Sequence, residues 1–517
     1  MSNKIYPIGI QNFEKIRNDG YFYIDKTALM YQMVKTGSYY FLSRPRRFGK
    51  SLLISTLEAY FQGKKELFEG LAVEKLEKDW IKYPILHLDL NIEKYDTPES
   101  LDKILNDNLE YWESQYGTRP SETSFSLRFA GIIQRACEKT GQRVVILVDE
   151  YDKPMLQAIG NEELQKQFRN TLKPFYGALK TKDGCIKFAL LTGVTKFGKV
   201  SVFSDLNNLD DISMWNEYVE ICGVSEREIH ENLEAELHEF AAARGITYDE
   251  LCEELRKSYD GYHFTHNSIG MYNPFSLLNA FKRKEFGSYW FETGTPTYLV
   301  KLLKKHHYDL ERMAHEETDA QVLNSIDSES TNPIPVIYQS GYLTIKGYDE
   351  RFGMYHLGFP NREVEEGFVR FLLPFYANVN KVESPFEIQK FVREVESGDY
   401  NSFFRRLQSF FADTTYEVIR DQELHYENVL FIVFKLVGFY VNVEYKTSDG
   451  RIDLVLQTDK FTYIMEFKLN GTAEEALQQI NDKHYALPFE MDGRKLFKIG
   501  VNFSAETRNI EKWIVES

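Results

Sequence analysis

Cysteine is scarce in this sequence, and the common motifs of zinc and serine hydrolases are absent from it. The four cysteines, at positions 137, 185, 222 and 252, follow neither a paired metal-ligand spacing nor a disulfide pattern. Neither a His-Glu-x-x-His motif nor a Gly-x-Ser-x-Gly elbow occurs. The sequence therefore gives no local support for a metalloprotease or a serine hydrolase, and it is typical of a reduced compartment.

Long hydrophobic runs are missing as well. The longest apolar stretch, at residues 429–441, contains Lys435 and is too short to span a bilayer. The N-terminus lacks the basic and then apolar segments of a secretory signal. We therefore expect a cytoplasmic protein that has no membrane partner.

Positive charge is in deficit, because 62 lysines and arginines face 78 aspartates and glutamates, for a net charge of -16. This balance argues against nonspecific nucleic-acid binding by the whole surface, so any DNA contact must be local or metal-assisted. The chain has 517 residues, of which 43% are hydrophobic. A chain of this length is too long for one typical hydrophobic core, and its hydrophobic content suffices for more than one. We therefore expect several globular domains.

Residues 46–51 carry the most informative motif, Gly49-Lys50-Ser51. They lie between an apolar run at 39–42 and an amphipathic stretch at 52–61, which places the motif at a strand-to-helix turn. Such a turn binds phosphate through backbone N–H groups, the lysine reaches the terminal phosphates, and the serine hydroxyl ligates magnesium. The motif predicts a nucleoside triphosphate site, with Arg46 adding positive charge. The alternative is an ordinary helix N-cap, and Arg44 stands where the pattern G-x-x-x-x-G-K-[ST] has glycine.

A second motif follows about a hundred residues later. The apolar run 144–148 leads directly into Asp149 and Glu150, as in a buried parallel strand that ends in carboxylates. Ligands of open α/β sheets bind at that end of the strands. Asp149 is therefore predicted to hold magnesium through water, and Glu150 to polarise the attacking water. Without the loop motif, a solvated acidic turn would be the simpler interpretation.

A third strand is predicted at 186–191, between the other two. Thr192 follows it and is expected to face the γ-phosphate. Lys196 and Lys199 come shortly afterwards and are candidates for stabilising transition-state charge, although lysines in this position are more often solvated.

The C-terminal part carries a separate group of charged residues. Strands are predicted at 439–445, 450–456 and 463–468. Period-two alternation places Glu466 and Lys468 on one face, and a neighbouring strand brings Asp453 beside Glu466. Two carboxylates form an all-oxygen site suited to magnesium or manganese, which activates water, while the lysine either positions the nucleophile or neutralises developing charge. Taken singly, the glutamate and lysine are also explained by a cross-strand ion pair.

The helices on either side of these strands add polar residues. Glu427 opens an apolar helical run that continues to Leu436, and Gln479 lies in a helix predicted at 473–485. The order is helix, three strands, helix and a last strand at 497–503. This ordered set is more specific than any of its parts.

The sequence resembles the bacterial AAA-ATPase-like family that carries a C-terminal PD-(D/E)XK nuclease-superfamily domain, and the resemblance covers nearly the whole chain. The matching segments are Tyr6-Pro7-Ile8-Gly9, Phe13 with Arg17, Tyr23-Ile24-Asp25-Lys26-Thr27, residues 43–51, Asp149-Glu150-Tyr151-Asp152 and Leu206-Asn207-Asn208-Leu209. The resemblance implies that Arg44 is normal for the family.

The resemblance also implies roles at both sites. Lys50 and Ser51 would bind ATP and magnesium, and Asp149 and Glu150 would support hydrolysis. Asp453, Glu466 and Lys468 match the acidic and lysine positions of the nuclease superfamily, and no core nuclease position is lost. Glu427 and Gln479 are then accessory residues. The superfamily includes members that have lost cleavage.

The sequence thus predicts an α/β protein in three parts. Residues 1–222 form a P-loop NTPase domain with a parallel sheet, 223–400 a mainly helical lid and connector, and 401–517 a restriction-endonuclease-like α/β domain. Aromatic residues of the middle part are expected to pack in its core rather than to stack on bases or adenine.

We expect an ATPase whose nucleotide state controls a nuclease acting on DNA. The alternative is a nucleotide-dependent switch or interaction protein whose nuclease-like domain binds but does not cleave. A narrower option is an ATPase that hydrolyses slowly or not at all. Oligomer formation is compatible with the sequence but does not follow from it.

Overall fold

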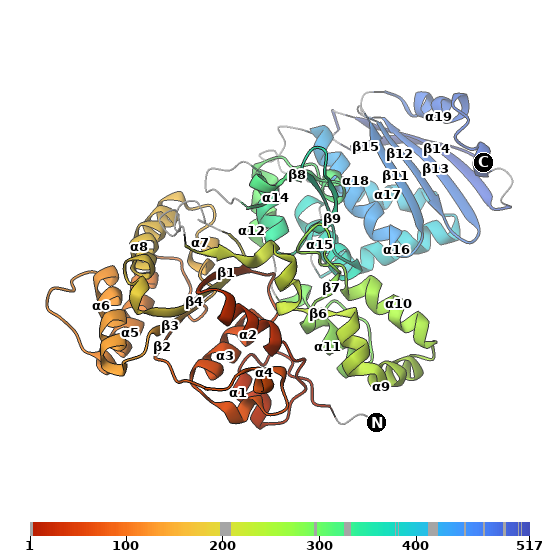
Figure 1. Cartoon of the computed structure of the whole chain (residues 1–517). Helices are drawn as coiled ribbons and strands as arrows, with labels where there is room; N and C mark the ends of the chain where they lie inside the picture. Colours follow the sequence, from red (N-terminus) through yellow and green to blue (C-terminus); the bar gives the residue numbers. More distant parts are fainter. Residues whose placement is uncertain are drawn as a thin grey trace. The chain divides into compact units, whose positions relative to one another are not determined.

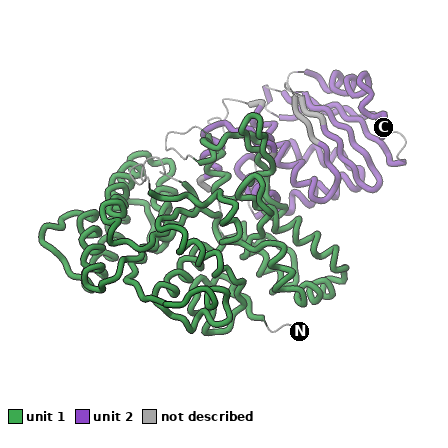
Figure 2. The backbone as a smooth tube through the Cα atoms, viewed as in Figure 1, with its two compact units in different colours: residues 1–294, 316–364 green, residues 295–315, 365–517 purple. Residues whose placement is uncertain are grey.

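The computed structural model describes most of the chain, in two compact units. The described residues are 4–196, 208–293, 297–324, 332–377, 379–380, 382–411, 422–448, 451–468, 471–489, 493–504, 506–507 and 509–517. One unit comprises Met1–Gly294 and Glu316–Val364, and the other comprises Thr295–His315 and Glu365–Ser517 (Figure 2). The predicted middle part, 223–400, contributes residues to both units, and the three-part division remains a prediction.

The first unit is built on a five-stranded parallel sheet (Figure 1). Its strands, in spatial order, are β2 (Ile85–Asp89), β3 (Val144–Asp149), β4 (Ile186–Gly193), β1 (Tyr39–Ser43) and β5 (Asp210–Asp211). The strand predicted at 186–191 pairs with β1 on one side and β3 on the other, which confirms its expected place. All six residues of β3 are buried, as expected for a strand covered on both faces.

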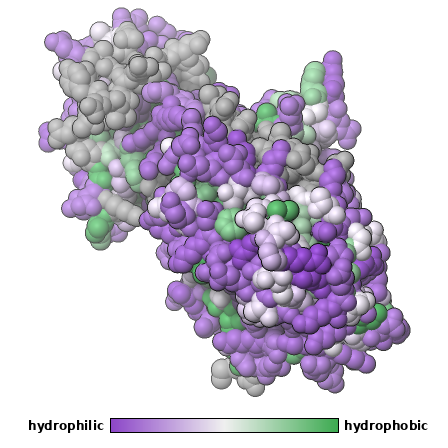
Figure 3. Space-filling view, turned by 90° about the vertical axis from the view of Figure 1, so that its left-hand side faces the viewer, coloured by the Kyte–Doolittle hydropathy of each residue, from purple (hydrophilic) through white to green (hydrophobic). Residues whose placement is uncertain are grey.

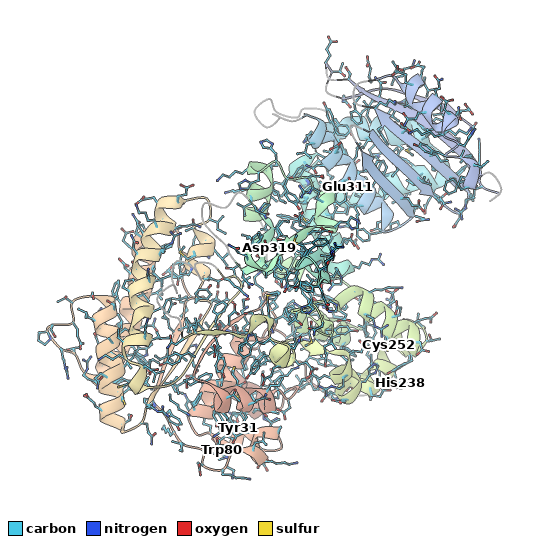
Figure 4. The ribbon with its side chains drawn as sticks, turned by 45° about the horizontal axis from the view of Figure 1, so that its top comes forward. Tyr31, Trp80, His238, Cys252, Glu311 and Asp319 are labelled. Carbon is cyan, nitrogen blue, oxygen red and sulfur yellow. The ribbon has the colours of Figure 1, made fainter. Side chains whose placement is uncertain are left out.

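Helices cover both faces of this sheet. They are α1 (Phe13–Asn18), α2 (Thr27–Thr36), α3 (Lys50–Phe61), α4 (Ala72–Leu76), α5 (Pro98–Tyr116), α6 (Phe125–Thr140), α7 (Lys153–Gln157) and α8 (Glu162–Thr181). Val145 and Leu147 of β3 share a core with α2 and α3, and the partly buried Tyr31 and Trp80 pack against that core (Figure 4). On α6 and α8, Phe129 and Phe175 stack with ring centroids 4.4 Å apart.

The rest of the first unit is helical with two small sheets. Its elements are β6 (Val224–Ser225), α9 (Glu226–Arg244), α10 (Tyr248–Tyr259), β7 (Met271–Tyr272), α11 (Pro274–Arg283), β8 (Glu317–Asp319), α13 (Ala320–Asn324), α14 (Ile334–Gln339), β9 (Thr344–Asp349) and β10 (Met354–Gly358). Ser225 begins α9 through a reciprocal capping box with Glu228. Helices α9 and α10 pack together, with His238 and Cys252 in this region (Figure 4). The sheet β8-β10-β9 is antiparallel and had no clear signal in the sequence.

The second unit is a five-stranded mixed sheet with helices. Its strands, in spatial order, are β11 (Asn442–Ser448), β12 (Arg451–Gln457), β13 (Phe461–Lys468), β14 (Lys495–Ser504) and β15 (Asn509–Glu516); only the β13–β14 pair is parallel. Its helices are α12 (Thr297–Lys305), α16 (Ser384–Ser397), α17 (Tyr400–Phe411), α18 (Gln422–Gly438) and α19 (Ala473–Asp482), and the division between units falls within α15 (Arg362–Tyr376).

Several element boundaries in this unit differ from the prediction by a few residues, and two of the differences have a clear local cause. β11 starts at Asn442 rather than at 439, because the N–H groups of Tyr440 and Val441 both bond to the Val437 carbonyl and extend the last turn of α18. Helix α19 ends at Asp482 rather than at 485, since His484 adopts a positive φ of 55°. Both differences are local end effects that hydrophobic pattern does not report.

Within the described ranges, no helix is both long and apolar enough to cross a membrane. Helix α18 contains most of the apolar stretch at 429–441, and its residues Val429, Leu430, Ile432 and Val433 are fully buried. Figure 3 shows one face of the molecule, where hydrophobic residues lie scattered among hydrophilic ones. The apolar residues of α18 therefore form part of a protein core.

Candidate functional site

The loop between β1 and α3 makes a tight turn at the carboxyl end of the parallel sheet. Arg47 and Gly49 both have left-handed backbone conformations, with φ of 65° and 98°. A Cβ atom on Gly49 would meet no heavy atom within 4 Å, so glycine is favoured there by its backbone conformation and not by lack of space. Helix α3 begins at Lys50, directly after this turn. The geometry is that of a phosphate-binding loop followed by a helix N-terminus.

The side chain of Lys50 turns back toward the backbone of this loop. Its side chain is 3% exposed, and Nζ donates hydrogen bonds to the carbonyl oxygens of Arg44 and Pro45 at 3.0 and 3.2 Å. The same Nζ lies 3.7 Å from Glu150 Oε1. The loop and the acidic motif after β3 therefore meet at the Lys50 ammonium.

The acidic motif is fixed by hydrogen bonds to its neighbours. Asp149 Oδ1 accepts a 2.6 Å hydrogen bond from Thr192 Oγ1 and a 3.0 Å bond from the backbone N–H of Glu150. Asp149 is 5% exposed and Thr192 is fully buried. Glu150 has a positive φ of 54°, an uncommon conformation for this residue. The structure thus brings Lys50, Asp149, Glu150 and Thr192 together; Ser51 lies in the first turn of α3, partly exposed.

Arg44 is an internal support of the loop. Its guanidinium donates to the carbonyl oxygens of Ser43, Ser213 and Tyr218 at 2.9, 2.8 and 3.1 Å. It also lies 3.9 Å from the centroid of the Phe264 ring. Burial lowers the pKa of Arg44 to about 10. The side chain that stands in place of the usual glycine therefore ties the loop to the segment after β5 and to the helical part of the unit.

The two other loop arginines face different surroundings. Arg46 donates a 3.1 Å hydrogen bond to Tyr342 Oη, and its side chain is partly exposed. Arg47 is exposed, with its guanidinium 5.2 Å from the Phe275 ring centroid. Phe48 packs edge-on against Tyr262, with ring centroids 4.8 Å apart. The predicted core role of the middle-region aromatics agrees with Tyr262, which is 2% exposed.

An apolar pocket of about 100 Å³ lies beside Gly49. It was not identified in the sequence, because no motif marks apolar side chains that come from separate segments. The pocket combines residues from the N-terminal segment, α2, the loop, α3, the segment before α9, and α11. Among its lining residues are Pro7, Phe22, Ile24, Leu52, Cys222 and Pro274. A flat apolar group next to the loop would find contacts there on several sides.

Two further carboxylates adjoin the site. Asp89 ends β2 directly opposite Asp149 in the sheet register. Burial raises its pKa, the Asp149 charge adds to the effect, and the Asn91 N–H opposes it. Asp89 follows an apolar alternation in the same way that Asp149 follows its strand, so the same pattern would have found it.

Asp152 is fully buried, and its carboxylate binds the backbone of the segment that follows β4. Its carboxylate accepts hydrogen bonds from the N–H groups of Val194 and Thr195 at 3.2 and 2.6 Å, and from Thr195 Oγ1 at 2.6 Å. Burial and the nearby Glu150 raise its pKa to about 7. Gly193 is required beside it, because a Cβ there would lie 2.5 Å from Asp152 Oδ1.

Lys196 is the next residue of this segment. It is 4% exposed, and its Nζ lies 2.9 Å from Asp211 Oδ2. Its backbone N–H donates to Gln339 Oε1 at 2.6 Å. These contacts favour a structural role for Lys196, while Lys199 lies outside the described residues.

The second candidate site lies on the sheet of the second unit. Asp453 on β12 is directly opposite Glu466 on the antiparallel strand β13, and Arg451 is opposite Lys468. Glu466 in turn pairs in register with Gly500 of β14, which packs directly beneath α19. Because paired residues share a face, Glu466 lies on the face that α19 covers. The pairing predicted for Asp453 is thus present in the backbone; its side chain is outside what the structure describes.

The remaining predicted residues surround this pair. Glu466 is fully buried and Lys468 is partly exposed. Gln479 lies on α19, and Glu427 lies on α18; both are partly exposed. Within the described residues, no group of three acidic, histidine or cysteine side chains is placed to hold a metal ion. Two opposed carboxyl-bearing positions nevertheless supply the oxygen donors that magnesium or manganese prefers.

The first unit is a P-loop nucleoside-triphosphatase fold, and the second unit is a restriction-endonuclease-like α/β fold. Residues 7–203 match the family model described as a predicted AAA-ATPase, and residues 421–513 match that of the PD-(D/E)XK nuclease superfamily. A protein of Azotobacter chroococcum mcd 1, "Uncharacterized protein in vnfD 5'region", is 35% identical over 533 residues, with 100% of both chains covered. The chain belongs to the family of AAA-ATPase-like proteins with a C-terminal PD-(D/E)XK nuclease-superfamily domain.

Proposed function

We propose that this protein binds ATP with magnesium, hydrolyses it, and uses its nucleotide state to control a metal-dependent nuclease that acts on DNA. The observation that carries the proposal is the convergence of Lys50, Glu150, Asp149 and Thr192 at the carboxyl end of one parallel sheet. Ligands of open α/β sheets bind at that end. The apolar pocket beside Gly49 supports the proposal, since it suits the adenine ring.

Each residue has a role that its contacts support. Lys50 would exchange the carbonyls of Arg44 and Pro45 for the terminal phosphates. Ser51 and Asp149 would hold the magnesium ion, which neutralises charge between the phosphates. Glu150 would orient the attacking water, and Thr192 keeps the Asp149 carboxylate in place. Arg46 would add positive charge near the phosphates.

The nuclease role rests on Asp453, Glu466 and Lys468. The two acids would hold magnesium or manganese, which activates water and stabilises the charged phosphorus centre. Lys468, two residues along β13 from Glu466 and on the same face, would neutralise charge on the phosphate. Glu427 and Gln479 would assist from the flanking helices. DNA contact would be local, given the net charge of -16.

One observation favours the alternative, a nucleotide-dependent switch whose nuclease-like domain binds without cleaving. The Glu466 carboxylate is fully buried, whereas a catalytic carboxylate must reach a metal ion beside the DNA backbone. Substitution of the acidic pair is expected to have a different effect under each of the two functions. In a switch, Asp453→Ala alters partner binding only.

The test is cleavage of linear, circular and single-stranded DNA with magnesium or manganese, with and without ATP. Wild type is compared with Asp453→Ala, Lys50→Ala and a matched control, Asp459→Ala, at an exposed aspartate in the β12–β13 turn. We expect cleavage that Asp453→Ala abolishes, that Asp459→Ala preserves, and that ATP or Lys50→Ala changes. ATP turnover without metal-dependent cleavage in the wild type would establish the switch instead.

A further inference from the structure

A tryptophan from the helical part of the first unit contacts the backbone of the phosphate-binding loop. The indole Nε1 of Trp290 donates a 2.9 Å hydrogen bond to the carbonyl oxygen of Arg46. Trp290 is 1% exposed and Arg46 is partly exposed, so this bond is partly buried. The two residues are 244 positions apart in the sequence. The bond therefore links the loop to a segment that the sequence motifs of the nucleotide site do not include.

This contact controls the direction of one loop N–H group. The carbonyl oxygen of Arg46 and the N–H of Arg47 belong to the same planar peptide and point to opposite sides of it. Fixing the oxygen on Trp290 therefore fixes the N–H on the other side. Arg47 has a positive φ of 65°, which an arginine adopts only when its surroundings hold it there. Loop N–H groups are the donors that such sites use for phosphate oxygens.

Trp290 is itself held in place. Its backbone N–H donates a 2.6 Å hydrogen bond to Glu363 Oε1, and Glu363 is 7% exposed at the start of α15. The carbonyl of Trp290 accepts bonds from the N–H and the Oγ1 of Thr293 at 3.1 and 2.7 Å. The indole is thus fixed through its own backbone on both sides.

Neighbouring contacts reinforce the same part of the loop. The ring of Tyr342 lies 5.3 Å from that of Trp290, and its hydroxyl accepts a 3.1 Å bond from Arg46. Gly341 packs so closely on Pro45 that a Cβ there would lie 2.6 Å from Pro45 Cβ. Residues 45 and 46 are therefore held between residues 290, 341 and 342.

We propose that Trp290 is a positioning residue for nucleotide binding: its indole sets the Arg46–Arg47 peptide in the phosphate-binding orientation, and Glu363 fixes the indole. The proposal rests on the proposed nucleotide-binding function. The helical part of the unit then determines phosphate affinity from a distance, because the Trp290 side chain bonds to the loop backbone and does not contact the nucleotide.

The test uses the full-length protein and titration calorimetry with ATP and magnesium. Trp290→Phe keeps an aromatic ring but removes the N–H donor. The matched control is Trp112→Phe, at another buried tryptophan, on α5, which packs against Phe129. We expect Trp290→Phe to weaken ATP binding about tenfold, the effect of one lost hydrogen bond at a partly buried site. Trp112→Phe is expected to lower thermal stability and leave ATP affinity unchanged.

Glu363 gives a second test. Glu363→Gln keeps an oxygen acceptor for the Trp290 N–H and should retain near wild-type affinity, whereas Glu363→Ala should weaken ATP binding as Trp290→Phe does. The double variant Trp290→Phe with Glu363→Ala should lose no more than either single variant, since both act through one contact. If Trp290→Phe fails to fold, the pair at Glu363 carries the test alone.

The outcomes separate the two proposals. Wild-type ATP affinity in folded Trp290→Phe, or equal affinities in Glu363→Gln and Glu363→Ala, would overturn the role of Trp290 while leaving nucleotide binding intact. A wild-type protein that binds no ATP, and whose titration Lys50→Ala leaves unchanged, would overturn both proposals together.

Discussion

Thr192 Oγ1 donates a 2.6 Å hydrogen bond to Asp149 Oδ1 and so joins the carboxyl ends of two neighbouring strands, β4 and β3. Thr192 is fully buried and Asp149 is 5% exposed, so water does not replace this bond. The hydroxyl therefore determines where the carboxylate points. Its effect on function follows from the role proposed for Asp149.

Thr192→Val is expected to slow ATP hydrolysis by about tenfold or more, because an isosteric side chain without the hydroxyl leaves the Asp149 carboxylate free to turn. Steady-state phosphate release, with kcat and KM determined separately, measures the effect. Thr192→Ser keeps the hydroxyl and should retain most of the activity. Equal rates for the valine and serine variants would show that this hydrogen bond does not matter for turnover.

Arg44→Gly restores the common loop pattern but is expected to destabilise the protein. The substitution removes a buried guanidinium and leaves the Ser213 and Tyr218 carbonyls without its hydrogen bonds, at a cost of about 3 kcal/mol. Chemical denaturation of the wild type and the variant gives the difference. Improved stability or tighter ATP binding in Arg44→Gly would contradict the support role of this arginine.

Glu363 should make the first unit less stable as the pH rises. Burial raises its pKa from 4.5 to about 7, so the folded protein holds a proton that the unfolded chain has already released between these values. The free energy of unfolding therefore falls from about pH 4.5 to about pH 7, by up to about 1.4 kcal/mol per pH unit for one such group. Urea denaturation at several pH values measures this slope.

Glu363→Gln cannot titrate and should flatten that dependence. Part of the slope should remain, because Asp152 is also buried, with its pKa raised from 3.8 to about 7. A slope that is unchanged in Glu363→Gln would show that this carboxyl is ionised in the folded protein throughout the range.

Gly500→Ala is expected to destabilise the second unit and to reduce any cleavage. A Cβ at this position would lie 2.1 Å from the Ala473 carbonyl oxygen and 2.5 Å from the Leu477 nitrogen, so α19 must move away from the sheet. Overpacking of this kind costs about 1–3 kcal/mol. Thermal denaturation and DNA cleavage measure the two effects.

Gly438→Ala is a suitable control in the same unit. Its Cβ would approach Val443 at an ordinary contact distance of 3.6 Å. We expect little change in stability or cleavage from it. A milder effect of Gly500→Ala than of Gly438→Ala would argue against close packing of α19 on β14.

The main elements around both sites could be predicted from local pattern. The loop at 46–51 follows an apolar strand, and Asp149 ends a continuous apolar run, so strand, turn and acid were all visible in the sequence. Period-two alternation placed Glu466 and Lys468 on one face of a strand. The strand at 186–191 was expected between β1 and β3, and it lies there. The roles of these residues remain predictions.

The sequence by itself determined which segments form the loop, the acidic strand ends and the paired strands of the two candidate sites, because the motifs are short and each depends on residues close together in the chain. Only the tertiary structure decided which distant groups complete them. Trp290 bonds to the Arg46 carbonyl, which lies 244 residues away in the sequence. Arg44 bonds to the carbonyls of Ser213 and Tyr218, and the apolar pocket beside Gly49 also combines separate segments. Buried hydrogen bonds and apolar contacts of this kind follow from packing and have no period or motif that a sequence can display.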